Sequence, residues 1–352
     1  MTNKHETYMS KLPDMSGSIA KNRFRVELLW GIEKLLDCLD RGIEDFTVVF
    51  DYCCDIELHL DGSYEFYQVK TSAGKKFGVS WVSKKSSQSG TSIVGKLYEL
   101  HDIESDGLIR LVIVGNKPFT KKNPATDKKE DFDQPGELLF STLHDDDKKK
   151  IEEAIIEHLP GLEPNLDILS YILVAIDLSN PDDSIRGHLI RTYESTMNCE
   201  ARKPGALYRA LKGLAETKAC TEKQQTTYDE IVANKAITDK DISSLFDLYA
   251  DRENSSQDYV MKWIDKQPPL KRIDLKCAYE EVIANLYKPR GRDLLEACIK
   301  VVTSMDNSLS EDEIVEGVTN SITKSHPVEI TDAMCDIYAI LALYEVVEKR
   351  HE

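Results

Sequence analysis

The chain has 352 residues, which is more than one small domain needs and predicts two units. Hydrophobic residues make up 41% of the chain and charged residues 30%, so it can fill a core, and an intrinsically disordered protein is excluded. The longest uncharged apolar run, residues 337–344, is far shorter than the roughly 20 residues of a membrane span, so no membrane partner is expected.

The start of the chain and its cysteines favour a cytoplasmic protein. Residues 1–13 are polar and contain no apolar segment typical of a secretory signal, and residues 1–15 are expected to form a flexible tail. The eight cysteines form no CxxC motif and no Cys/His cluster with zinc spacing, which favours reduced thiols.

Apolar spacing predicts a helix followed by a group of strands. From Lys21 to about residue 41, apolar residues recur every three or four positions, and Gly42 is a typical helix end. Residues 61–63 predict a hairpin turn between two strands. The elements expected up to residue 136 are strands over 46–50, 55–60 and 64–71, a loop over 72–90, a helix over 91–101, a strand over 108–114 and a loop over 116–136.

The rest of the chain is expected to be mostly helical. A charged helix over 146–158 and a strand over 169–178 precede Pro181, after which helical spacing dominates and prolines mark the breaks. The prediction is an α+β or α/β domain over 16–180 followed by a mostly α-helical domain over 181–352. The helices expected in the second domain are 184–196, 204–217, 221–233, 239–251, 256–266, 270–287, 291–304, 310–322 and 330–349.

Charge is distributed unevenly along the chain. The net charge of −17 means that most of the surface should repel nucleic acid. Residues 68–129, however, contain twelve Lys or Arg and only five Asp or Glu, a local excess of +7. This asymmetry suggests a surface that faces a polyanion, and the alternative interpretation is a solvated, lysine-rich loop region.

Polar side chains converge at one end of the predicted hairpin. A turn at residues 61–62 pairs positions whose numbers add up to about 123, so Asp55 is expected opposite Gln68. Because side chains alternate along a strand, Gln68 and Lys70 share a face, and Asp55 shares a face with Glu57. Asp51 closes the preceding strand and is expected beside them.

A carboxylate, an amide oxygen and an ammonium group in one place suit metal-dependent phosphodiester hydrolysis. Mg²⁺ prefers carboxylate and carbonyl oxygens and keeps waters for the nucleophile and the phosphate. A neighbouring lysine can hold the attacking water and stabilise the transition state. The alternative is an ordinary surface hairpin with outward polar residues, and His59 is interpreted as such an outward residue.

The order helix, three strands, helix, strand, with Asp55, Gln68 and Lys70 across the second and third strands, resembles the PD-(D/E)XK nuclease core. The sequence QVKT at 68–71 also resembles the N-terminal nuclease family of anti-phage effectors. That family is known from CBASS effector endonucleases and from nucleases paired with a HerA-type ATPase. The resemblance covers residues from about 16 to 255. Its weaker matching segments are 16–19, 51–57, 81, 92–97, 112–119, 173–178 and 234–238.

The resemblance implies a metal-dependent DNA endonuclease that acts in bacterial anti-phage defence on double-stranded DNA. It implies Asp55, Asp51 and Gln68 as ligands of Mg²⁺, or of Mn²⁺, and adds Lys70 to the catalytic set. Gln68 stands where an acidic residue is commoner, so the charge of the site depends on the two aspartates. Glu27 and Glu57 are implied as accessory acids.

The resemblance also bears on partners. Residues 256–352 show no SAVED domain of the kind that senses a nucleotide in CBASS effectors, which favours activation by a HerA-type ATPase or by homo-oligomerisation. No P-loop motif is present, which argues against ATP hydrolysis by this chain. The apolar stripe of residues 330–349 suits either an internal core helix or an oligomer interface.

Five lysines are expected to line the path of the DNA because they follow the hairpin directly. They are Lys75, Lys76, Lys84 and Lys85 in the expected loop and Lys96 in the next helix. Two other functions remain open from the sequence: a nuclease-derived scaffold that binds DNA or a motor protein without cutting, and a nuclease that acts on RNA or single strands.

Overall fold

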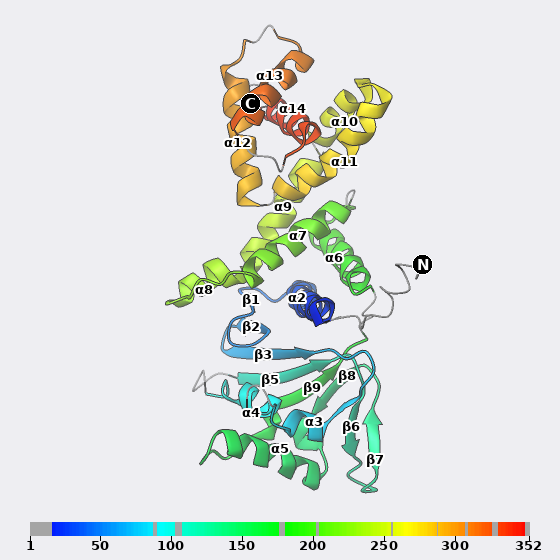
Figure 1. The fold of residues 1–352 in the computed structure, drawn as a ribbon, viewed down its shortest axis with the longest axis vertical. Helices are drawn as coiled ribbons and strands as arrows, with labels where there is room; N and C mark the ends of the chain where they lie inside the picture. The colour runs from blue at the N-terminus through cyan, green and yellow to red at the C-terminus, as the bar shows by residue number, and fades with distance from the viewer. Residues whose placement is uncertain are drawn as a thin grey trace, which may run out of the picture. The chain divides into compact units, whose positions relative to one another are not determined.

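The computed structural model describes residues 16–86, 90–102, 108–175, 180–201, 204–254, 256–286, 288–306, 309–325 and 330–348. The tail predicted over 1–15 lies outside these residues. Contacts divide the chain into two compact units, the first made of residues 1–38, 43–185 and 218–237, and the second of residues 39–42, 186–217 and 238–352. The first unit is mixed α/β and the second is helical (Figure 1). The domain limits predicted at residues 180 and 181 stay a prediction.

The first helix, α2, spans Ser16–Asp40 and begins five residues before Lys21. It buries an apolar face that includes Val26, Leu29 and Ile32. Gly31 lies so close to the sheet that a Cβ atom there would meet the Phe50 ring at 2.4 Å and Ile56 at 2.7 Å. The absence of a side chain at Gly31 therefore lets α2 pack directly on the strands.

A seven-stranded sheet forms the centre of the first unit, in the order β10-β1-β2-β3-β5-β9-β8. Strands β1, β2 and β3 form an antiparallel meander, and β5 and β9 continue the sheet parallel to β3. The strands are β1 (Thr47–Phe50), β2 (Ile56–Leu60), β3 (Ser63–Lys70), β5 (Leu108–Gly115), β8 (Gly136–Leu139), β9 (Leu169–Leu173) and β10 (Ala236–Thr238).

Helices cover both faces of this sheet (Figure 1). On the face of α2, Trp30 packs edge-on against Tyr67, with the ring centroids 5.7 Å apart. On the opposite face, Phe66 and Ile113 share a buried core with α3 (Val79–Ser83), α4 (Ile93–Tyr98) and α5 (Asp145–His158). The alternation of Phe66 and Tyr67 between the two cores is what a strand buried on both sides requires.

Both predicted loops contain regular structure. The loop expected over 72–90 holds β4 (Phe77–Gly78) and α3, and the loop expected over 116–136 holds β6 (Phe119–Lys122), β7 (Lys129–Phe132) and the start of β8. Strands β4, β6 and β7 form a second, three-stranded sheet. These predictions were wrong because strands of two to four residues are too short to show a period, and charged pairs such as Lys121 with Glu130 replace apolar alternation.

Two elements near the end of the first unit also differ from the prediction. Strand β9 ends at Leu173, so the strand expected to reach residue 178 is shorter, and residues 176–179 lie outside the description. The helix expected over 221–233 is α8, Tyr228–Lys235, because the Thr227 side chain accepts a hydrogen bond from the Glu230 N–H and caps the helix there.

The described part of the second unit is mostly helical. They are α6 (Asp182–Met197), α7 (Pro204–Ala219), α9 (Asp239–Asn254), α10 (Ser256–Lys266), α11 (Pro269–Leu286), α12 (Pro289–Ser304), α13 (Glu311–Ser325) and α14 (Asp332–Glu348), of which α6 and α7 begin or end in the first unit. Helices α10 to α13 surround α14, and Ile337, Leu341 and their neighbours are buried. The described part of the apolar stripe, on α14, is therefore the core of the group of helices α10 to α14.

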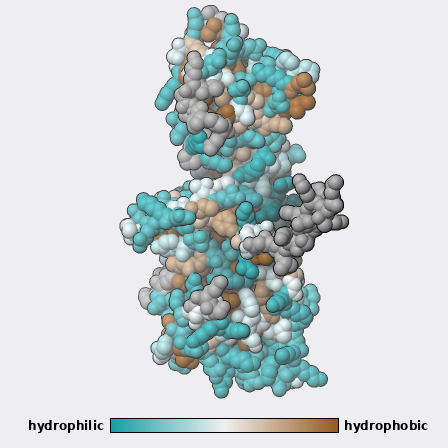
Figure 2. All heavy atoms as spheres, viewed as in Figure 1, coloured by the Kyte–Doolittle hydropathy of each residue, from teal (hydrophilic) through white to brown (hydrophobic). Residues whose placement is uncertain are grey.

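The surface shows no large apolar area in the view of Figure 2, where hydrophilic residues dominate and hydrophobic ones form small patches. Among the described helices, none is both long and apolar enough to cross a bilayer.

Candidate active site

The loop between β1 and β2 forms a tight turn that carries both predicted aspartate ligands. Phe50 pairs with Ile56, so the turn consists of residues 51–55. Asp51 adopts the left-handed conformation, with φ of 50°, and its N–H donates to the Asp55 carbonyl at 3.0 Å. Aspartate tolerates this conformation better than most residues, which explains its place at the start of the turn.

Asp55 lies at the centre of the predicted set. The pairing of Ile56 with Tyr67 confirms the predicted register of the hairpin. The Asp55 Oδ2 atom accepts hydrogen bonds from the Val69 N–H at 2.6 Å and from the Gln68 side-chain amide, and the Lys70 Nζ atom lies 3.6 Å away. Because the Gln68 amide nitrogen faces Asp55, the amide oxygen of Gln68 is available to another partner. The structure thus brings Asp55, Gln68 and Lys70 together.

Glu27 on α2 belongs to the same electrostatic group. Burial, together with the negative charges of Asp55 and Asp51, raises the pKa of Glu27 to about 7 against the opposing charge of Lys70. A carboxyl group whose pKa is raised close to 7 beside two other acids is typical of a functional site. Glu27 therefore senses the charges of Asp51, Asp55 and Lys70, and its role as an accessory acid stays a prediction.

The carboxyl end of β3 is fixed by Asn116, which the sequence analysis did not single out. The Asn116 side chain accepts from the Ser72 N–H at 2.9 Å and donates to the Ser72 carbonyl at 3.1 Å. The last pair between β3 and β5 is Lys70 with Gly115, so these two side-chain bonds join the chain just beyond both strands. Asn116 therefore fixes the backbone two residues after Lys70.

Tyr171 contacts the chain on both sides of Asn116, at Gly115 and at Lys117. A Cβ atom at Gly115 would meet the Tyr171 hydroxyl at 2.0 Å, so only glycine lets this ring pack against the strand. The hydroxyl donates to the Lys117 carbonyl at 2.5 Å. The sequence signal was the Gly-Asn pair at the end of a β-branched strand, which indicates a strand end without showing this contact.

Glu57 does not point to the Asp55 group. It is 2% exposed, and its Oε1 atom accepts a hydrogen bond of 2.6 Å from the Cys53 N–H in the turn. Its Oε2 atom lies 3.0 Å from the His59 Nε2 atom. His59 is itself only 9% exposed, so its interpretation as an outward residue was wrong. The bonds of Glu57 indicate that it supports the turn.

The predicted DNA-binding lysines are all exposed, but two of them form ion pairs. Lys76 pairs with Asp131, and Lys85 pairs with Glu157 at 2.6 Å. In the part of the chain that the structure describes, no ion pair is found for Lys75, Lys84 and Lys96. Arg110, Lys121 and Lys122 in the same basic stretch also pair with acids, so the local positive charge is smaller than the sequence suggests.

The donors around Asp55 suit a hard cation such as Mg²⁺, because they are carboxylate and amide oxygens. In the described residues, however, the carboxylate oxygens of Glu27, Asp51 and Asp55 do not all lie within 4.8 Å of one another. The chemistry of these donors therefore fits the ion, but the three carboxylates lie farther apart than the ligands of a closed coordination sphere.

Other acidic groups offer weaker alternatives. Asp127, His144 and Asp146 lie within 4.8 Å of one another, but the Lys122 Nζ atom bridges the two aspartates at 2.9 and 2.6 Å and satisfies their charge.

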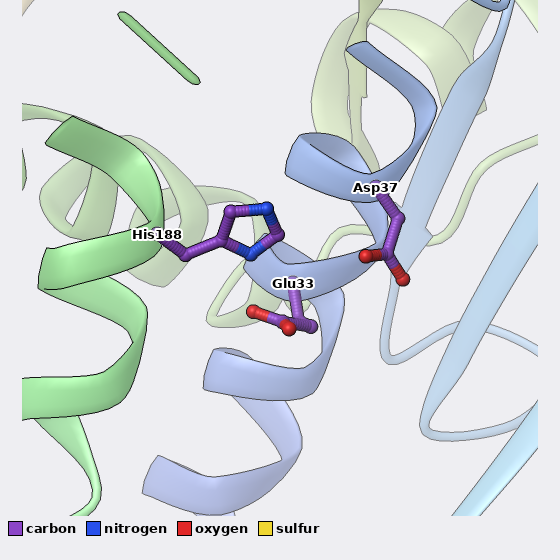
Figure 3. A group of neighbouring side chains, drawn as sticks. All are labelled: Glu33, Asp37 and His188. Carbon is purple, nitrogen blue, oxygen red and sulfur yellow. The ribbon is translucent and has the colours of Figure 1, made fainter. Parts of the chain in front are cut away.

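A pair of acids on α2 is a further alternative. Glu33 and Asp37 lie one turn apart on α2 (Figure 3), and Lys34 pairs with Asp37. His188 in that view belongs to α6 of the second unit, whereas both acids belong to the first.

An acid and a lysine that meet at the end of a hairpin in a mixed sheet are compatible with phosphodiester cleavage. The model of the family described as Cap4, dsDNA endonuclease domain, matches residues 15–219. The chain belongs to this family of anti-phage effector nucleases, which confirms the resemblance, although the match ends before residue 255. No curated protein and no solved structure matches the chain.

Proposed function

We propose that this protein is a metal-dependent endonuclease that cuts double-stranded DNA as an effector of anti-phage defence. The family supports DNA cleavage. The observation that carries the metal-dependent mechanism is the meeting of Asp55, Gln68 and Lys70 at the end of β2 and β3. The order of α2, three strands, α4 and β5 supports a PD-(D/E)XK-like core.

In this proposal, Asp55 and Asp51 hold Mg²⁺ or Mn²⁺ together with the Gln68 side-chain oxygen. The bound ion would activate water and neutralise charge on the phosphate. Lys70, 3.6 Å from Asp55, orients the attacking water and stabilises the negative charge that develops on the phosphate oxygens. Glu27, with its pKa raised to about 7, is an additional acid that can hold a proton near the site.

The function is tested by incubating the purified full-length chain with linear and supercoiled DNA in Mg²⁺, in Mn²⁺ and in EDTA. We expect cutting that depends on the metal and stops in EDTA. DNA binding without cutting in every metal would favour a non-cutting scaffold instead.

We further propose that cleavage is triggered by a partner, a HerA-type ATPase, or by homo-oligomerisation. Two active sites side by side can cut both strands of a duplex, which one site that cuts a single strand cannot do alone. Adding the ATPase is expected to raise the rate at which the protein cleaves DNA. An unchanged rate, together with an unchanged oligomeric state, would argue against this trigger.

A further inference from the structure

A partly buried chain of hydrogen bonds reaches the turn of residues 51–55 from outside the segment that matches the nuclease family. It begins at the turn itself, where the Cys53 N–H donates to the Glu57 carboxylate at 2.6 Å. The turn carries Asp51 in a left-handed conformation. A loop with such strain keeps one shape only when its surroundings hold it. Glu57 is the side chain that holds the middle of this turn.

Glu57 needs partners of its own because it is 2% exposed. A buried carboxylate is costly unless it is hydrogen-bonded. Its second oxygen lies 3.0 Å from the His59 Nε2 atom. A carboxylate only accepts hydrogen bonds, so Nε2 is the donor and this bond fixes the orientation of the imidazole. His59 therefore determines where Glu57, and through it Cys53, can lie.

The next partner is Tyr228 at the first position of α8. Its hydroxyl lies 3.0 Å from the His59 Nδ1 atom, and its ring stacks on the imidazole with centroids 5.8 Å apart. The same hydroxyl interacts with the Thr47 side chain on β1. With Nε2 donating to Glu57, a neutral imidazole accepts the Tyr228 hydroxyl hydrogen at Nδ1. Tyr228 thus completes the support of the histidine.

The family match ends at residue 219, so Tyr228 lies beyond it. Helix α8 nevertheless packs against β1, and both belong to the first unit. The chain of contacts therefore joins a segment outside the matched nuclease region to the turn that carries Asp51 and Asp55. Tyr228 is 49% exposed, so its hydroxyl can be removed without opening a cavity in the core.

We propose that Tyr228, His59 and Glu57 are positioning residues that fix the turn of residues 51–55 and thereby the acids of the active site. The inference deepens the proposed function and rests on it for the role of Asp51 and Asp55. It also changes the role of Glu57, from an accessory acid to a support of the backbone.

The main variant is Tyr228→Phe, with Tyr64→Phe as its matched control. Tyr64 also packs against His59, with ring centroids 4.7 Å apart, but no hydrogen bond of its hydroxyl is found among the described residues. Both variants remove one phenol oxygen beside the same imidazole. A third variant, Glu57→Gln, removes the charge at the other end of the chain of contacts and keeps the shape of the side chain.

Two measurements are made on the full-length chain. The first is hydrogen exchange of the Cys53 amide in the absence of metal. The second is binding of Mn²⁺ alone, followed by electron paramagnetic resonance. We expect Tyr228→Phe and Glu57→Gln to speed exchange at Cys53 and to weaken Mn²⁺ binding by about tenfold, the lower end of the effect of losing outer residues that orient metal ligands. Tyr64→Phe should match the wild type in both.

Wild-type exchange at Cys53 in both Tyr228→Phe and Glu57→Gln would overturn the proposal. Faster exchange with unchanged Mn²⁺ binding would overturn its link to the metal site. A wild-type protein that binds no Mn²⁺ would instead contradict the proposed function, because the exchange measurement tests the support of the turn without metal.

Discussion

At the scale of single residues, the candidate site is organised around one oxygen of Asp55. The Val69 N–H, the Gln68 amide and the Lys70 ammonium all approach Oδ2. In the described residues, no hydrogen bond to Oδ1 is found, so this oxygen can face a cation. The contacts to Oδ2 thus fix the carboxylate, while Oδ1 stays available to a metal ion, as a positioned metal ligand requires.

Asn116 is expected to act on the site through the backbone. The variant Asn116→Ala loses both hydrogen bonds to Ser72, each worth about 1 kcal/mol, and should lower the free energy of unfolding by about 1–2 kcal/mol. It should also slow single-turnover cleavage by roughly tenfold, because Lys70 is then less firmly placed.

Urea unfolding and single-turnover kinetics measure the two effects of Asn116→Ala. Asn116→Asp serves as the comparison, since it keeps the acceptor for the Ser72 N–H and loses the donor. Wild-type cleavage by the alanine variant would show that the backbone holds Lys70 without Asn116.

Glu27 should make stability depend on pH. Its pKa rises from 4.5 to about 7 on folding, so between these pH values the folded chain binds a proton that the unfolded chain has lost. Stability therefore falls as pH rises through this window. Glu27→Gln removes the effect and should be more stable than the wild type at pH 8 in EDTA, by about 1–2 kcal/mol after allowance for partial exposure.

The pH dependence is measured by urea unfolding of both proteins at pH 5 and pH 8. The difference between them should be small at pH 5 and large at pH 8. A constant difference, or a wild type that is the more stable of the two at pH 8, would contradict the raised pKa.

At the scale of elements, the structure separates the five predicted DNA-binding lysines into two groups. Lys75, Lys84 and Lys96 are exposed, and no ion pair is found for them in the described chain, whereas Lys76 and Lys85 pair with Asp131 and Glu157. The first group is expected to contact phosphates, since exposed ion pairs leave less charge for DNA.

The double variant Lys75→Glu, Lys84→Glu should therefore bind DNA more weakly and with a flatter dependence on salt. Each phosphate contact contributes about 0.9 to the slope of log affinity against log salt, so the slope should fall by about 2. The control is Lys76→Glu, Lys85→Glu, which should change the slope less. Equal slopes in all three proteins would place these lysines away from the DNA.

The hairpin could be predicted from the sequence, but its supports could not. The turn at residues 61–62 and the alternation of β2 and β3 are local signals, and together they fix the register that brings Asp55 to Gln68. The contact of His59 with Tyr228 joins residues 169 positions apart, and Asn116 reaches Ser72 over 44 positions. No local period encodes such contacts.

The same limit explains the missed second sheet. Strands β4, β6 and β7 are two to four residues long, and their pairing depends on charged and polar partners such as Thr120 with Asp131. The elements that were predicted well are the long ones, such as α2 and β5, whose apolar spacing extends over eight or more residues.

At the scale of the whole molecule, the second unit bears on assembly. Helix α14 is enclosed by α10 to α13, so its apolar stripe is used inside the unit, and an oligomer must use another surface. We still expect a homo-oligomer, because cutting both strands of a duplex requires two active sites if each site cuts one strand. Light scattering of the full-length chain, alone and with a HerA-type ATPase, is expected to show an assembly. A monomer under both conditions would contradict it.

We propose Asp55 and Lys70 as the catalytic pair at the end of the hairpin. The most direct test of this assignment is the cleavage rate of purified Asp55→Ala and Lys70→Ala in Mg²⁺, with Asp61→Ala at the opposite end of the same hairpin as the control. Both site variants should keep the wild-type circular dichroism and lose cleavage by at least about a hundredfold, since each removes an interaction made in the transition state. Asp61→Ala should cut like the wild type. Wild-type cutting by either site variant would contradict the account.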